Sequence, residues 1–187
     1  MRHLLYTLLL SFFLGTSLSA QIDESKLGAW YMYFFTVDSK TPWGVQGDVQ
    51  YRNWNTIGDL EQLLIRGGLT YSPENVDGMF TLGYANITTG TYGDSDVTVS
   101  ENRIYQEALL PHKTSKNIWL KHRFRYEQRF VENQDLRTRY RYNLFLTIPL
   151  ILWQESQNLL YLSFYNELFI NGQRNIGSGN MVEIFDR

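Results

Sequence analysis

Residues 121–130 read KHRFRYEQRF, and residues 136–144 read LRTRYRYNL after a short polar turn. In both segments one parity is mostly charged and the other is mostly aromatic. Because successive side chains of a β-strand point to opposite faces, each segment predicts a strand with one charged and one aromatic face. A row of arginines is unusual on a solvated face. It suits the lumen of a closed β-barrel whose outer face contacts lipid.

Strand-like segments recur along the chain. The expected strands cover residues 27–36, 44–54, 60–71, 79–88, 103–110, 117–131, 136–148 and 159–170. Most are longer than the roughly 5–6 residues usual in soluble sheets, and they fit tilted membrane-spanning strands of about 9–11 residues. The sequence therefore predicts an all-β fold: an antiparallel up-and-down β-barrel of the transmembrane type, with at least eight strands.

The connections between these strands carry residues that favour turns. Short polar turns are expected at residues 38–42, 72–75, 112–116 and 132–135, and longer loops at 89–102 and 171–180. Gly67-Gly68 falls inside an expected strand and indicates a bulge or a bend. Barrels that begin and end in the periplasm have their long loops outside the cell. The 89–102 loop falls on the periplasmic side, so either one strand is miscounted or this barrel has a long inner turn.

The first 20 residues have the pattern of a secretory signal peptide. Residues 2–3 are basic, residues 4–14 are largely apolar, and residues 17–20 are small enough for cleavage. The alternative is an uncleaved anchor helix, but the apolar run is shorter than the roughly 20 residues that span a bilayer. We therefore expect a signal peptide at 1–20 and one β-barrel domain at 21–187, exported to the outer membrane of a Gram-negative cell. Its partners would be outer-membrane lipid and the barrel insertion machinery.

Composition excludes several other classes of site. The chain has 187 residues and no cysteine, so it fits one domain without disulfides or thiolate metal ligands. His3, His112 and His122 are scattered, so neither a metal site nor a cofactor is indicated. Gly177–Gly179 has no following helix or lysine and is typical of a loop. Nucleic-acid binding is not expected, because the basic residues are predicted to face inward in an exported protein.

Four stretches resemble the DUF2490 family: His122–Phe130, Arg137–Tyr142, Gln50–Asn53 and Gly58–Leu64. This is a family of exported bacterial proteins with an uncharacterised domain, predicted to be outer-membrane β-barrels and typical of Bacteroidetes-like bacteria. The resemblance covers nearly all of residues 27–187. It implies a barrel fold, and it implies no enzyme activity, cofactor or catalytic residue.

The C-terminal end departs from the family pattern. Family members usually continue for several strands beyond a segment like residues 184–187, where this chain stops without a C-terminal aromatic residue. We therefore expect a truncated reading frame, with residues 27–36 as an open sheet edge. The intact gene would then encode further strands with acidic residues on the lumen side.

A register slip of two residues would change the partners of the two arginine strands but not their faces. With the turn centred on Asn133, the register is set. Arg125 then faces Arg141, Arg129 faces Arg137 and Glu127 faces Arg139, an arrangement in which like charges meet unless anions intervene. The predicted lumen cluster comprises Arg103, Glu107, Arg123, Arg125, Glu127, Arg129, Arg137, Arg139 and Arg141. The same parity adds Asp48, Arg52, Arg66, Lys121 and Glu167, which makes ten basic and four acidic residues. The residues expected to face lipid are Phe124, Tyr126, Tyr140, Tyr142, Leu144 and Leu146.

Several functions fit a barrel with this charge pattern. The first is structural: ion pairs and tyrosines fill a narrow lumen and fix its geometry. The second is binding or passage of small anions, because arginine forks match carboxylate and phosphate. The third is a lipid-modifying enzyme, for which His122 with Thr138 or Ser163 is the nearest nucleophile–base set, although Ser163 has lumen parity and His122 does not. A soluble lipocalin-like barrel, with aromatics inside and arginines outside, is the non-membrane alternative. No catalytic constellation is found, and the structural function is the main expectation.

Overall fold

The computed structural model describes residues 28–115, 118–152, 159–177 and 179–186. The expected signal peptide at residues 1–20 lies outside these ranges. In the part of the chain that the structure describes, no helix is long and apolar enough to cross a membrane.

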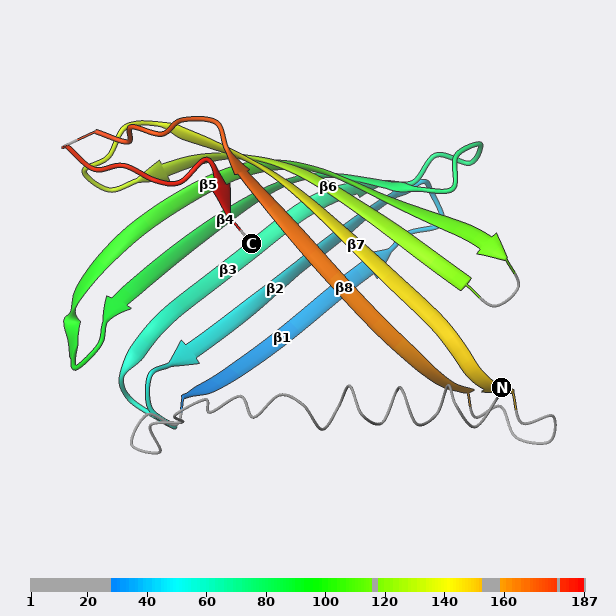
Figure 1. Ribbon diagram of the computed structural model, residues 1–187, viewed down its shortest axis with the longest axis horizontal. Coiled ribbons are helices and arrows are strands. Elements are labelled where there is room, and N and C mark those ends of the chain that lie inside the picture. The colour runs from blue at the N-terminus through cyan, green and yellow to red at the C-terminus, as the bar shows by residue number, and fades with distance from the viewer. Residues whose placement is uncertain (1–27, 116–117, 153–158, 178, 187) are drawn as a thin grey trace, which may run out of the picture.

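The described strands form one antiparallel sheet, and strands that follow each other in sequence lie side by side (Figure 1). Its strands are β1 (Ala29–Asp38), β2 (Trp43–Asn53), β3 (Leu60–Tyr71), β4 (Met79–Thr91), β5 (Asp94–Ser115), β6 (Ile118–Val131), β7 (Arg137–Leu152), β8 (Leu159–Asn171) and the short β9 (Phe185–Asp186). The sheet curls into a half-barrel. The predicted all-β, up-and-down architecture with at least eight strands is therefore confirmed. Among the described residues, β1 pairs with β2 alone, and β8 pairs with β7 and β9.

The prediction of a long loop at residues 89–102 is wrong. β4 continues to Thr91 and β5 begins at Asp94, so the connection is a tight turn at Tyr92-Gly93. Gly93 has a φ of 73°, a conformation that glycine adopts without steric cost. The many Gly, Asp and Ser residues suggested a loop, but threonine and valine alternate there and both favour strands. With only two residues in this turn, its place at the end of the sheet where β1 begins no longer conflicts with the topology of outer-membrane barrels.

Two smaller expectations are also corrected. Residues 112–115 were expected in a turn, but β5 runs through Pro111 to Ser115 and pairs with β6 there. Gly67-Gly68 is not a bulge, because both flanking ladders pass through it without a shift; the irregularity lies between Arg52 and Asn53. Gly68 instead gives close packing, since a Cβ there would lie 2.7 Å from the side chain of Thr81.

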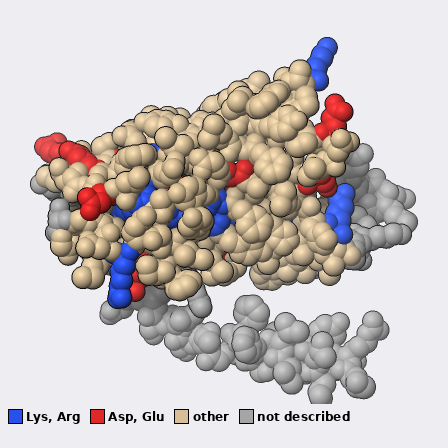
Figure 2. All heavy atoms as spheres, turned by 90° about the horizontal axis from the view of Figure 1, so that it is seen from above, with Lys and Arg blue, Asp and Glu red and all other residues tan. Residues whose placement is uncertain are grey.

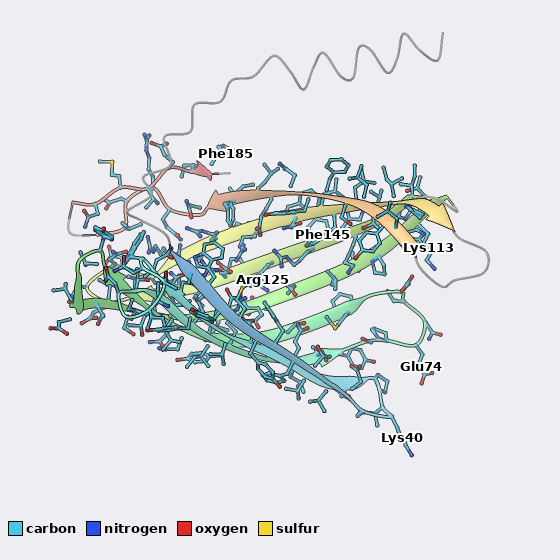
Figure 3. The ribbon with its side chains drawn as sticks, turned by 90° about the horizontal axis from the view of Figure 1, so that it is seen from below. Lys40, Glu74, Lys113, Arg125, Phe145 and Phe185 are labelled. Carbon is cyan, nitrogen blue, oxygen red and sulfur yellow. The ribbon has the colours of Figure 1, made fainter. Side chains whose placement is uncertain are left out.

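A single-layer sheet can bury side chains only on the face toward which it curls. The buried apolar cluster, Leu64, Ala85, Ile87 and Tyr105, shares the parity of the charged residues. The charged face is therefore the concave face, and Arg125 lies within the space that the sheet encloses (Figure 3). Lys40, Glu74 and Lys113 lie together at one end of the half-barrel instead.

Candidate functional site: the charged concave face

All nine residues of the predicted lumen cluster come from three adjacent strands, β5, β6 and β7, and share the concave face. The register between β6 and β7 is the one predicted: Arg125 faces Arg141, Arg129 faces Arg137 and Glu127 faces Arg139. Asn133 in the connecting turn has a φ of 58°, a left-handed conformation that asparagine tolerates better than most residues. The turn therefore fixes which charges meet across the ladder.

The first ion pair of this face lies on β2 and β3. Arg66 donates from Nε and Nη2 to Asp48, with distances of 2.9 Å to Oδ1 and 2.9 Å to Oδ2. This two-pronged geometry is the strong form of an arginine–carboxylate contact. Asp48 also accepts a hydrogen bond from Gln50, so the carboxylate is fully engaged.

The second ion pair links β5 to β6. Arg125 Nη2 lies 2.6 Å from Oε2 of Glu107, the residue directly opposite it in the ladder. The guanidinium also stacks 4.5 Å from the ring centroid of Tyr105. A buried tyrosine beside an arginine adds both packing and a cation–π contact. The expected filling of the concave face by ion pairs and tyrosine is present here.

Glu127 is the most enclosed charge on this face, with 1% of its residue surface exposed. Its Oε1 accepts from Arg141 at 2.9 Å, and guanidinium nitrogens of Arg125 and Arg103 lie 3.7 and 3.8 Å from the carboxylate. Arg141 also reaches Glu167 on β8 at 2.8 Å, and Arg123 reaches the same carboxylate at 3.0 Å. One continuous network thus ties β5, β6, β7 and β8 together.

Glu101 is a member of this network that the sequence reasoning missed. Its carboxylate accepts from Arg103 at 2.6 and 3.0 Å and from Arg129 Nη2 at 2.8 Å. The sequence predicts a loop over residues 89–102, and a residue in a loop has no assigned face. The parity was available as a signal, since Glu101 stands two residues before Arg103 and continues the same face. Glu101 adds a fifth acid to the four acidic and ten basic residues that the sequence predicts on this face.

Four of these ten basic residues have no carboxylate partner among the described residues: Arg52, Lys121, Arg137 and Arg139. Arg52 donates to Gln50 and Gln62 and lies 4.4 Å from the ring of Trp30. Lys121 lies 5.9 Å from the ring centroid of Phe145. Arg139 donates to the neutral amide oxygen of Asn171 at 3.0 Å. Two of these four residues, Arg137 and Arg139, lie on β7. The positive charge without a carboxylate partner is therefore concentrated on that strand.

The outer face has the opposite character. Its exposed side chains include Val45, Leu69, Leu82, Tyr84, Phe124, Tyr140, Phe164 and Leu168. An apolar hollow of about 890 Å³ lies against these strands, with Phe80, Phe124, Tyr126, Tyr140 and Tyr142 in its lining. Seen from above, most of the surface between the two ends of the molecule is uncharged, apart from basic atoms left of the centre and acidic atoms beside them (Figure 2).

The residues considered for enzyme chemistry do not come together. His122 lies on the outer face, where its Nδ1 is 2.9 Å from the hydroxyl of Tyr142. Ser163 lies on the concave face beside Thr147, and Thr138 contacts Gln173. His112 and His122 are neighbours on the outer face, with ring centroids 6.4 Å apart. Across the described ranges, no three His, Asp or Glu side chains are grouped to hold a metal ion.

Comparison with known proteins gives one match. The model of a family described as "Protein of unknown function (DUF2490)" matches residues 27–187. No curated protein and no solved structure matches the chain significantly.

Proposed function

This chain belongs to the DUF2490 family, and we propose that it forms the wall of an outer-membrane β-barrel whose arginine–carboxylate network braces the concave side. The role proposed for it is mainly structural. The observation that carries this proposal is the inverted polarity of the sheet: charged side chains are enclosed, and large apolar side chains are exposed.

The outer face is the first support. Soluble monomers seldom expose contiguous apolar patches beyond a few hundred Å². Here aromatic and aliphatic side chains follow each other across strands β2 to β8, and ring pairs such as Tyr126–Tyr140 and Phe124–Tyr142 lie on that surface. Contact between side chains of this kind and lipid is favourable, whereas their exposure to water is unfavourable. The outer face is therefore suited to contact with a lipid bilayer.

The polarity also argues against a soluble lipocalin-like barrel. Such a barrel needs an apolar interior for its ligand and a polar exterior for water. Glu127 and Arg129 are among the most buried side chains, whereas Phe124 and Tyr140 are 47% and 53% exposed. The arrangement is the reverse of what a soluble binding barrel requires.

The ion-pair network supports a bracing role. Asp48, Glu101, Glu107, Glu127 and Glu167 each contact at least one arginine, and most of the contacts cross from one strand to another. Enclosed ion networks add little net stability, but they penalise alternative pairings because any slip leaves a charge uncompensated. Fixing strand register is therefore the contribution that we assign to them.

Single-cysteine labelling tests the proposal directly, because the chain has no cysteine of its own. Full-length protein with Tyr140→Cys or Arg139→Cys is produced in a Gram-negative host, and the outer-membrane fraction is treated with a lipid-phase and an aqueous maleimide. The two residues are adjacent on β7 and point to opposite faces. We expect the lipid-phase probe to label position 140 and the aqueous probe to label position 139.

Two results would overturn the proposal. One is recovery of the protein in the soluble periplasmic fraction. The other is reversed labelling, in which the lipid-phase probe reacts at position 139 and the aqueous probe at position 140. Heat-modifiable migration in detergent gels provides an independent check that the labelled protein is folded.

A further inference from the structure

Three arginines stand in a row across neighbouring strands of the concave face. Arg103 on β5 faces Arg129 on β6, and Arg129 faces Arg137 on β7. Like charges directly opposite each other in a sheet are destabilising unless an anion intervenes. Arg139 lies two residues beyond Arg137 on the same face, which adds a fourth guanidinium beside the row.

The nearby carboxylates are already engaged by other arginines. Glu101 accepts bidentate contacts from both Arg103 and Arg129. Glu127 faces Arg139 in the ladder, but its hydrogen bond comes from Arg141 at 2.9 Å. The row and Arg139 thus place four positive charges beside two carboxylates. Glu101 is already shared by two arginines, and Glu127 is hydrogen-bonded to Arg141.

Arg137 and Arg139 are the two members of this group that form no ion pair with a carboxylate of the described residues. Nε of Arg137 is buried and has no hydrogen-bond partner within the described residues. Arg139 donates from Nε to the amide oxygen of Asn171 and makes no ion pair in the same part of the chain. Both side chains are half-buried, so water screens them less than it would screen surface arginines. Placing two such charges beside Arg129 is costly unless something negative binds there.

We propose that this four-arginine cluster binds an oxyanion of the phosphate class, held by Arg137 and Arg139 with Arg129 and Arg103 behind them. The inference rests on the charges of the concave face and not on the location of the protein. A phosphate group brings about two negative charges at neutral pH, which matches the two arginines without a carboxylate. Its oxygens also accept the planar fork of a guanidinium in a bidentate fashion. A single carboxylate would compensate only one of the two.

The test uses full-length protein folded in neutral detergent and titrated with inorganic phosphate at constant ionic strength. We expect saturable binding by calorimetry and a rise of the unfolding midpoint with phosphate concentration. Arg137→Gln and Arg139→Gln should each weaken this binding by about tenfold or more, because each removes a charge-assisted contact. Chloride at the same ionic strength should give no saturable signal.

Lys121→Gln is the matched control. It removes one positive charge from the same face and also lacks a carboxylate partner among the described residues, but it lies toward the opposite end of β6. We expect its affinity for phosphate to stay within about twofold of the unsubstituted protein, since long-range charges are largely screened beyond roughly 10 Å. If all three variants lose binding equally, the effect is general electrostatics and the proposal fails.

A second arm separates free phosphate from a lipid headgroup. Phosphatidylcholine bicelles are prepared with and without phosphatidic acid, and the unfolding midpoint of the protein is compared between them. A rise with phosphatidic acid alone, abolished by Arg137→Gln, assigns the same site to a lipid phosphate. Absence of any response to phosphate or phosphatidic acid at millimolar concentration overturns the proposal. Failure of Arg137→Gln and Arg139→Gln to fold would also overturn it, because both arginines would then be structural.

Discussion

Arg141 pairs with Glu127 at 2.9 Å, although the residue directly opposite Glu127 in the β6–β7 ladder is Arg139. The same guanidinium contacts Glu167 on β8 at 2.8 Å. A diagonal neighbour on an antiparallel pair is within reach of a long side chain. Arg141 therefore connects β6, β7 and β8 through one side chain, and Arg139 is left with a neutral partner.

This pairing predicts that Arg141→Gln is strongly destabilising. Glu127 would keep only the more distant contacts to Arg125 and Arg103, at 3.7 and 3.8 Å. Removing one partner of an enclosed ion pair costs about 3–5 kcal/mol. Urea unfolding of the folded protein in detergent measures the change. Lys121→Gln, which removes no ion pair within the described ranges, should have little effect. Equal urea midpoints of unfolding for Arg141→Gln and Lys121→Gln would show that the ion pairs of Arg141 do not stabilise the sheet.

Glu101→Gln should be destabilising in a similar way. The carboxylate is shared by Arg103 and Arg129, and its loss would leave two facing arginines without their counter-charge. We expect a loss of about 3–5 kcal/mol in the free energy of unfolding. Glu74→Gln in the exposed β3–β4 connection removes the same charge and is the matched control, expected to be almost neutral. A similar loss of unfolding free energy in Glu101→Gln and Glu74→Gln would show that the ion pairs of Glu101 do not contribute to stability.

The faces of the sheet were predictable from sequence for a simple physical reason. The side-chain period of a strand is two, so a run such as Arg123, Arg125 and Arg129 can only lie on one face. The register follows from placing the centre of the turn at Asn133, and the observed ladder has that register. A slip of two residues would keep the same faces and change the partners, so the sequence alone restricts the register without leaving a single choice. These features depend on local geometry alone.

The choice of ion-pair partners was not predictable in the same way. Register places Arg139 opposite Glu127, but arginine reaches residues two positions away, and Arg141 takes the carboxylate. Glu101 was missed because the turn-forming residues near it outweighed the strand-forming threonine and valine. The predicted facing of Glu127 and Arg139 is confirmed, and the loop that hid Glu101 is wrong. Both the ion-pair choice and the strand at Glu101 are settled by packing across strands, where local preferences compete.

A glycine on the concave face gives a prediction about packing. The ring of Tyr105 covers Gly83 on the neighbouring strand, and a Cβ at Gly83 would overlap that ring. Gly83→Ala should displace Tyr105 from its contact with Arg125 and destabilise by about 1–3 kcal/mol. Gly67→Ala is the control, since a Cβ there meets nothing within 4 Å and should be neutral or slightly stabilising. Equal unfolding midpoints for these variants would exclude a packing role for Gly83.

Tyr140 distinguishes a lipid-facing sheet from a soluble one. It is 53% exposed on the outer face and packs against Tyr126, with ring centroids 4.9 Å apart. Tyr140→Leu and Tyr140→Arg both lose this ring pair, but only the arginine brings a charge. In a bilayer, Tyr140→Arg should be less stable than Tyr140→Leu by about 2–4 kcal/mol if the site lies near the midplane. In water the two should be nearly equal, because an exposed arginine is well solvated. Urea unfolding in phospholipid vesicles measures the difference, and equal stabilities would place this face outside the hydrocarbon core.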